Sequence, residues 1–219
     1  MEEKGEQRKI GLFGGTFNPI HLGHLRGAEE IREAFGLHQV IFIPAALPPH
    51  KTKEEVIEAH HRFEMVKRAI AGNPFFSVTD IELSRPEKSY SIDTIRYFRK
   101  NYTDLFYFIL GGDAFWEIET WKEFQDLFSN CNFIVMTRPG VQRPSISLPA
   151  ALVPAFHYEE EIQAWVHASG HLLSFKEITV LNISSTKVRE TIEARKSVRY
   201  LVPAEIEAYI EKYGLYRRG

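Results

Sequence analysis

The sequence predicts an α/β fold: a doubly wound parallel sheet with a small helical cap at its C-terminal end. Short apolar runs alternate along the chain with segments in which apolar residues recur at helical spacing, which is typical of alternating strands and helices. Most of the apolar runs end in glycine, proline or polar residues. Beyond residue 182 the patterns indicate helices only, and these form the predicted cap.

The start of the chain predicts a strand, a glycine turn and a helix. Ile10–Phe13 is a short apolar run that leads directly into Gly14 and Gly15. Apolar residues then recur at helical spacing over Leu25–Phe35. Gly36 is expected to end this helix, because glycine readily adopts the left-handed conformation that follows a last turn.

The middle of the chain continues the alternation. Val40–Ile43 is β-branched and aromatic and is followed by proline, as in a buried parallel strand. Helical spacing of apolar residues predicts a helix over His60–Ala71, and strict alternation predicts a strand over Phe76–Leu83. A helix marked by Ile92–Phe98 and a strand at Leu105–Leu110 are expected next.

The last part of the chain is less regular. Cys131–Thr137 is a further apolar run and a predicted strand. After Arg138 a series of prolines predicts irregular, surface-exposed structure, which lasts until a strand at His171–Leu181. Helices are expected to begin near Ser184 and to span Pro203–Tyr213, with proline in the first turn.

Length and composition limit the class of protein. The chain has 219 residues, 44% of them apolar, and a net charge of −2. We expect one domain over residues 1–219, with an α/β core at 8–181 and a helical part at 182–219. The balanced charge gives no basic face for nucleic acid. The lone Cys131, expected to be buried, and the lack of a signal-like or membrane-spanning segment predict a cytoplasmic protein without a membrane partner.

Five polar clusters each follow a predicted strand. Because the carboxyl ends of parallel strands meet at one edge of a sheet, we expect these clusters to enclose one site. Glycines and a helix N-terminus bind phosphate groups well, so the first cluster predicts a cradle for nucleotide phosphates. The clusters are Gly14–His24, Pro44–Lys51, Gly111–Asp113, Arg138–Gly140 and Ser184–Arg189.

Two histidines, His21 and His24, lie near the start of the first helix. Because they follow the glycines, we interpret them as hydrogen-bond donors to phosphate. The alternative is that one caps the helix and the other is a core histidine. A protein-held metal such as zinc is not expected, because no further Cys/His cluster supplies the remaining ligands.

Two segments resemble the signatures of the nucleotidylyltransferase superfamily: G-G-T-F-N-P-I-H-L-G-H at Gly14–His24 and I-S-S-T-K-V-R at Ile183–Arg189. The resemblance implies a Rossmann-like nucleotidylyltransferase fold, with His21, His24 and Arg189 as the catalytic residues. The residues that it implies for ATP binding are Gly14, Gly15, Thr16, Phe17, His21, His24, Gly111, Asp113, Ile183, Ser184, Ser185, Thr186 and Arg189.

Further segments are similar to the bacterial nicotinate-nucleotide adenylyltransferases: Pro48–Lys51, Ser89–Thr94, Gly111–Asp113 and Val198–Pro203. This resemblance implies adenylyl transfer from ATP to nicotinate mononucleotide, which gives deamido-NAD and pyrophosphate in NAD biosynthesis. It also implies Mg²⁺, bound with ATP mainly through water. The residues that it implies for the pyridine nucleotide are Asn18, Lys51, Ser89, Tyr90, Ser91, Trp121 and Arg138.

The chain departs from that family at two of these places. The family often has threonine and tyrosine where this chain has Ser91 and Lys122. If the threonine contact is made by the backbone, the change to serine matters little. If Lys122 reaches the pyridine carboxylate, it strengthens the preference for the acid over the amide.

Several alternatives stay open at this point. The chain could be a related transferase that uses phosphopantetheine or a sugar or glycerol phosphate, or a non-catalytic nucleotide sensor. Arg217 and Arg218 are thin support for an RNA-binding module, and both a monomer and a homo-oligomer are compatible with the sequence.

Some side chains have structural alternatives. Trp116 is expected in the core, and Glu159–Glu161 on a solvated helix face. Asp113 either caps a helix or binds a ribose, and Lys51 is either a solvated charge or a triphosphate contact.

Overall fold

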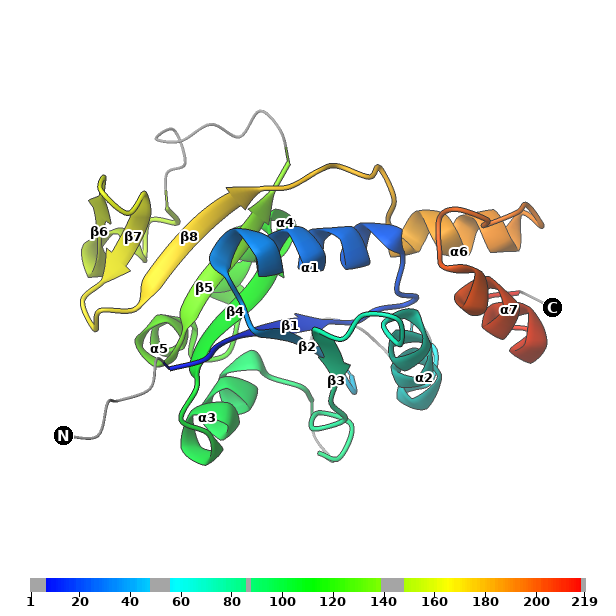
Figure 1. Cartoon of the computed structure of the whole chain (residues 1–219), viewed down its shortest axis with the longest axis horizontal. Coiled ribbons are helices and arrows are strands. Elements are labelled where there is room, and N and C mark those ends of the chain that lie inside the picture. Colours follow the sequence, from blue (N-terminus) through cyan, green and yellow to red (C-terminus); the bar gives the residue numbers. More distant parts are fainter. Residues whose placement is uncertain (1–6, 48–55, 86–87, 139–147, 218–219) are drawn as a thin grey trace.

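A central β-sheet organises the molecule (Figure 1). The computed structural model describes residues 7–47, 56–85, 88–138 and 148–217. Within these ranges eight strands form one sheet in the order β3-β2-β1-β4-β5-β8-β7-β6. The strands are β1 (Lys9–Gly15), β2 (Gln39–Pro44), β3 (Phe76–Val78), β4 (Leu105–Gly111), β5 (Asn132–Thr137), β6 (Phe156–Glu159), β7 (Ala164–His167) and β8 (Leu172–Glu177).

The sheet is parallel from β3 to β8, and only β6 and β7 run antiparallel to their neighbours. The chain starts in the middle at β1, moves outward through β2 and β3, and then returns to add β4 and β5 on the other side of β1. This reversal of direction beside β1 is the switch point at which doubly wound sheets bind ligands. The predicted doubly wound parallel sheet is confirmed.

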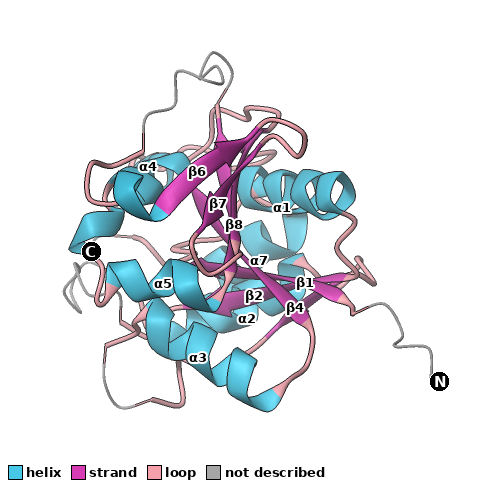
Figure 2. Cartoon of the chain, turned by 90° about the vertical axis from the view of Figure 1, so that its left-hand side faces the viewer, coloured by secondary structure: helices cyan, strands magenta, loops and turns pink. Residues whose placement is uncertain are grey.

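Helices cover both faces of the sheet. The helices of the described residues are α1 (Leu22–Phe35), α2 (Ala59–Ala69), α3 (Ser91–Asn101), α4 (Gly112–Trp116), α5 (Phe124–Asn130), α6 (Ser185–Glu193) and α7 (Ala204–Tyr213), with short 3₁₀ turns at Ile118–Thr120 and Val153–Ala155. Buried residues of α1, α2, α6 and α7 form one core cluster with the sheet, and those of α3, α4 and α5 form the other. Figure 2 shows α3 and α5 on the opposite side of the sheet from α1.

Alternate residues of the central strands supply the two core layers. Leu12 of β1 belongs to the cluster under α3, and its neighbour Phe13 belongs to the cluster under α1. Both are at least 96% buried, which is why such strands consist almost entirely of apolar residues. Cys131 is buried in the first of these layers, as predicted.

The C-terminal helices share the core of the sheet. Val188 of α6 and Ile206 of α7 are fully buried in the same cluster as Ile31 of α1. The single domain over residues 1–219 stays a prediction. None of the helices in the described ranges is long and apolar enough to cross a membrane.

Two strands, β3 and β8, are shorter than predicted, because their pairing with the neighbouring strand stops early. β3 stops at Val78, opposite Phe42 of β2, and the predicted continuation to Leu83 is a turn. β2 itself ends soon after, at Pro44, a residue that has no N–H to donate. β8 ends at Glu177, opposite the last residue of β5, rather than at Leu181.

The stretch predicted to be irregular contains a missed β-hairpin. β6 pairs with β7, which in turn pairs with β8 and extends the sheet. The prediction of a helix face at Glu159–Glu161 is therefore wrong: Glu159 ends β6, and the next two residues lie in the turn. The prediction of a core position for Trp116 is also wrong, because Phe115 takes the inward position of the single-turn α4 and Trp116 is 49% exposed.

Candidate active site

A pocket of about 440 Å³ lies at the carboxyl ends of β1 and β4, beside the switch point. Its walls come from the end of β1, the loop after β2, the start of α3 and the segment that follows β4. The lining residues are Gly14, Gly15, Thr16, Ala45, Glu82, Ser89, Tyr90, Ser91, Ile92, Phe108, Leu110, Gly111, Asp113, Ala114, Glu117, Thr120, Trp121 and Lys122. Three of the predicted clusters thus meet here.

Gly14 and Gly15 complete β1 and do not form the predicted turn. They pair with Ile43 and Pro44 of β2. A side chain at Gly15 would have its Cβ 2.8 Å from the ring of Phe17. The missing side chain therefore lets the buried Phe17 ring fold back against the strand, and the turn begins only after Gly15.

The loop between β1 and α1 is tightly packed. Phe17 has a positive φ of 46° and is 2% exposed, and the Asn18–Pro19 peptide bond is cis. The Phe17 ring packs edge-on against Phe13 and lies 5.2 Å from the ring of His24. Asn18 is buried as well, and its Oδ1 accepts a hydrogen bond from Tyr216 Oη at 2.9 Å.

His21 and His24 cap the N-terminus of α1 together. His24 N–H donates to His21 Nδ1 at 3.3 Å, and His21 N–H donates to His24 Nδ1 at 3.2 Å. Their rings are stacked, with centroids 3.6 Å apart. A Cβ at Gly23 would lie 3.1 Å from His21 Nδ1, so glycine between the histidines leaves room for this arrangement. The helix begins at Leu22, earlier than the predicted Leu25.

This capping fixes the protonation of both rings. Each Nδ1 accepts a backbone hydrogen bond, so the single proton of a neutral imidazole resides on Nε2. Burial lowers the pKa of His21 to about 4. Burial, and secondly the charge of His21, also hold the pKa of His24 well below its usual value. Near neutral pH both rings are therefore neutral Nε2–H donors, and capping and phosphate binding are compatible roles.

The lowered pKa of His21 predicts a loss of stability in acid. The unfolded chain takes up this proton near pH 6.5, whereas the folded chain resists until about pH 4. The free energy of unfolding is therefore unaffected by this group above about pH 6.5. It falls by on the order of 3 kcal/mol as the pH falls to about 4. Urea unfolding of the parent and of His21→Asn, which keeps a capping acceptor, measures this. We expect the variant to have a shallower acid dependence, and parallel curves would contradict the assignment.

The second signature segment contacts the first directly. Arg189 Nη1 donates to Asn18 O at 2.8 Å, and Ser185 Oγ donates to Pro19 O at 2.8 Å. Ser184 caps α6 by accepting from Lys187 N–H at 3.1 Å. Figure 1 shows the N-terminal end of α1 next to α6. Segments some 160 residues apart in the sequence thus form one loop cluster.

The Val198–Pro203 segment lies behind this cluster. Leu201 O accepts the N–H of Leu22, the first residue of α1, at 3.0 Å. Val198 and Val202 of the same segment are buried in the core cluster that includes α1. The segment therefore braces the helix end that carries the histidines.

The predicted pyridine-nucleotide residues Ser89, Tyr90, Ser91 and Trp121 all line the pocket. Ser89 Oγ accepts the Ala46 N–H at 2.9 Å, which ties the start of α3 to the loop after β2. The Trp121 ring meets Phe108 edge-on and packs against the core while still lining the pocket.

Lys122 also lines the pocket. Its Nζ lies 3.2 Å from Asp93 Oδ2 and 4.8 Å from the centre of the Tyr90 ring. A cation beside an aromatic ring and a helix N-terminus suits an anionic aromatic ligand.

The remaining predicted residues are less enclosed. The Asp113 side chain is 95% exposed, makes no capping hydrogen bond and lies 3.6 Å from Arg138. Its predicted alternative as a helix cap is therefore wrong. Ile183 and Thr186 belong to the α6 loop cluster, where Thr186 Oγ1 accepts from Arg189 at 3.2 Å. Lys51 lies outside the described residues, as does Arg218.

Two buried polar residues near the pocket were missed in the sequence. Glu82 lines the pocket, accepts from Thr94 Oγ1 at 2.7 Å, and burial raises its pKa. Arg62 is fully buried on α2. A signal was available for Arg62: it stands three and four positions before Met65 and Val66, on the apolar stripe of its helix.

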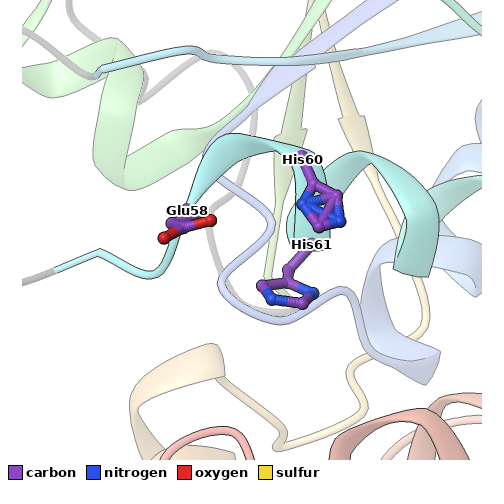
Figure 3. A group of neighbouring side chains, drawn as sticks. All are labelled: Glu58, His60 and His61. Carbon is purple, nitrogen blue, oxygen red and sulfur yellow. The ribbon is translucent and has the colours of Figure 1, made fainter. Parts of the chain in front are cut away.

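Within the described ranges, one group of side chains has the composition of a metal site: Glu58, His60 and His61 (Figure 3). The two imidazole rings lie 4.2 Å apart and are tilted by only 34°. Their ligand atoms and those of Glu58 lie within 4.8 Å of one another, and no further acidic, histidine or cysteine side chain of the described residues joins this group. The Tyr209 hydroxyl also already contacts His61 Nδ1 at 3.0 Å.

The order of the strands, and the contact between the loop after β1 and the start of α6, define a nucleotide-binding α/β protein of the nucleotidyltransferase class. The chain belongs to the cytidylyltransferase-like family, which it matches over residues 12–191, and within it to the nicotinate-nucleotide adenylyltransferases. It is 47% identical to the probable nicotinate-nucleotide adenylyltransferase of Syntrophotalea carbinolica, over 95% of this chain and 97% of that protein. The corresponding protein of Geotalea daltonii is 43% identical, over 96% and 99%.

A solved structure has the same fold. The nicotinic acid mononucleotide adenylyltransferase of Plasmodium falciparum, complexed with NaAD, superimposes with a TM-score of 0.73. The alignment covers 95% of this chain and 97% of that one, at 21% sequence identity. The predicted family and the Rossmann-like nucleotidylyltransferase fold are thus confirmed.

Proposed function

We propose that this protein transfers the adenylyl group of ATP to nicotinate mononucleotide, which gives deamido-NAD and pyrophosphate. The observation that carries this proposal is the direct contact between the two signature segments, Arg189 to Asn18 O. It holds the capping histidines and the N-terminus of α6 at the same edge of the sheet as the pocket, where Gly14, Gly15 and Thr16 line that pocket. One triphosphate can therefore contact both segments.

The chemistry needs alignment and charge stabilisation more than acid–base catalysis. The acceptor phosphate carries a charge of about −1.5 to −2 near neutral pH and attacks the α-phosphorus without a general base. The bond from that phosphorus to the bridging oxygen breaks, and its electron pair leaves with pyrophosphate. Holding the two anions in line can contribute roughly 7–11 kcal/mol, and one donor aimed at developing charge about 3–4 kcal/mol.

The residues divide this work by their position. The Nε2–H groups of His21 and His24 are the proposed donors to the α-phosphate region. Because both imidazole rings are neutral near pH 7, their ability to donate does not depend on protonation in that range. Arg189 and the N-terminus of α6 hold the β- and γ-phosphates. Gly111 and Asp113, where β4 ends at the pocket, are the proposed contacts of the ribose.

Magnesium enters this proposal with ATP. In the described part of the chain, no group of three acidic or histidine ligands lies at the pocket. The donor set therefore fits an ion that phosphate oxygens and water hold, which is the usual preference of Mg²⁺. When bound, it neutralises charge on the triphosphate.

The acceptor occupies the aromatic part of the pocket in this proposal. Trp121 and Tyr90 provide ring surfaces, and Ser89, Ser91 and the first turn of α3 provide polar groups for a carboxylate. Lys122 adds a positive charge on the same wall. Asn18 and Arg138 remain proposed contacts at the edge of the acceptor site.

Pyrophosphate release over a panel of acceptors tests the proposal. Purified protein with ATP and Mg²⁺ is given nicotinate mononucleotide, its amide, phosphopantetheine, and a sugar or glycerol phosphate. We expect turnover with the nicotinate compound, and slower turnover with the amide. Turnover with phosphopantetheine and with no other acceptor would identify a related transferase that uses phosphopantetheine. ATP binding without any turnover would identify a nucleotide sensor.

A further inference from the structure

Arg62 is a fully buried cation that binds three separate pieces of backbone. Its Nη1 donates to Thr16 O at 2.8 Å, its Nη2 to Ala46 O at 2.8 Å, and its Nε to Ile57 O at 3.1 Å. Thr16 belongs to the loop after β1, and Ala46 to the loop after β2. One guanidinium from α2 thus bridges the two loops that border the pocket.

No carboxylate in the described ranges forms an ion pair with Arg62. Burial lowers the pKa of its guanidinium to about 10, so the group stays charged near neutral pH. A buried charge is costly unless its donors are satisfied. Here carbonyl oxygens satisfy it, and the planar fork of donors can serve several carbonyls at once where a lysine ammonium cannot. The bridge therefore depends on an arginine.

The contact also orients the peptide group that follows Thr16. In a planar trans peptide the C=O of one residue and the N–H of the next point in opposite directions. Because Thr16 O points at the buried guanidinium, the Phe17 N–H points away from it. The strained, positive φ of Phe17 belongs to the same turn, and the contact holds that turn in place.

The second loop is tied to the acceptor side of the pocket. Ala46 N–H donates to Ser89 Oγ at 2.9 Å, and Ser89 N–H donates to Leu47 O at 3.2 Å. Ala46 therefore connects Arg62 to the start of α3. A continuous set of hydrogen bonds runs from the loop of the capping histidines to the wall that carries Ser89 and Tyr90.

We propose that Arg62 is a positioning residue of the transfer reaction: it fixes the spacing between the phosphate loop and the acceptor wall, and it turns the Phe17 N–H toward the triphosphate. The proposal rests on the proposed function for the identity of the two ligands. Arg62 touches no reacting atom; it acts through Thr16 and Ala46.

The test compares Arg62→Lys and Arg62→Met with a matched core variant, Leu173→Ala. Leu173 is fully buried in β8, outside the pocket lining, so its truncation destabilises the fold without altering these loops. Folded fractions are measured by urea unfolding, and kcat is expressed per folded molecule. ATP affinity is measured by calorimetry with ATP alone. If Arg62→Met does not fold, Arg62→Lys decides the outcome.

We expect Arg62→Lys to lower kcat by roughly tenfold or more, since small misalignments of reacting groups carry large penalties. Its ATP affinity is expected to fall about threefold or more, while Leu173→Ala changes neither quantity beyond about twofold. Equal effects of Arg62→Lys and Leu173→Ala on both quantities would overturn the proposal. A parent that binds ATP but lacks turnover would refute the proposed function, and the affinity comparison would still decide the role of Arg62.

Discussion

Replacing His24 by alanine is expected to lower kcat by about two to three orders of magnitude, with a much smaller change in ATP affinity. A donor aimed at charge that develops only in the transition state contributes about that factor. A group that binds substrate and transition state equally would raise KM instead. Single-turnover measurement of deamido-NAD formation, together with ATP calorimetry, separates the two effects.

The capping role of His24 requires its own controls. Its Nδ1 accepts the His21 N–H, so alanine removes a cap as well as a donor. Asparagine can replace the Nδ1 acceptor but lacks the Nε2–H, whereas glutamine places an amide N–H near the Nε2 position. We expect His24→Asn to be stable and slow, and His24→Gln to recover part of kcat. If His24→Asn keeps the parental kcat, the role of His24 is to cap α1, and it takes no part in the reaction.

Replacing Arg189 by alanine is expected to reduce kcat/KM for ATP by about two to three orders of magnitude. The guanidinium has five N–H donors, and the contacts to Asn18 O and Thr186 Oγ1 engage two of its nitrogens. In the proposed function its charge also faces the β- and γ-phosphates. Its loss therefore removes a charge-assisted contact and loosens the first loop at the same time. Initial rates at varied ATP measure the effect.

Lys187 on the same helix provides the matched control. Its side chain is exposed, and only its backbone N–H contributes to the cap of α6. Lys187→Ala removes one positive charge from α6 without touching the loop cluster, so we expect kcat/KM to change less than about threefold, as for a solvated charge. Comparable losses of kcat/KM in both variants would mean that the total positive charge of α6, and not a specific contact of Arg189, acts on ATP.

Most elements of the fold could be predicted because their signals are local. β1, β2, β4 and β5 are apolar runs with clear stops, and α1 ends at Gly36, which has the left-handed φ of 60° that its position requires. The β6–β7 hairpin was missed because the prolines before it indicated irregular structure, although each of its strands pairs with the next strand along the chain. Its place is set by pairing with β8, at the edge of a sheet that must already exist.

The candidate site also combines features that local sequence signals predict with features that depend on the rest of the fold. The loops could be assigned to one edge, since each follows a strand, and the structure brings Asn18 and Arg189 into contact. The mutual capping of His21 and His24 could not be read from their spacing, because it depends on Nδ1 orientation in a packed ring stack. Glu82 was missed as well, since its burial depends on the turn that replaces the predicted end of β3.

The sequence by itself determined the alternation of strands and helices, the edge of the sheet that carries the site, and the family. Apolar periodicity and turn residues encode these features within a few neighbouring positions. Only the tertiary structure decided how long β3 and β8 run, and that Arg62 is buried between two loops. The length of a strand depends on where its pairing with a neighbouring strand stops, and a buried cation persists only where distant carbonyls converge on it, so both depend on residues far apart in the chain.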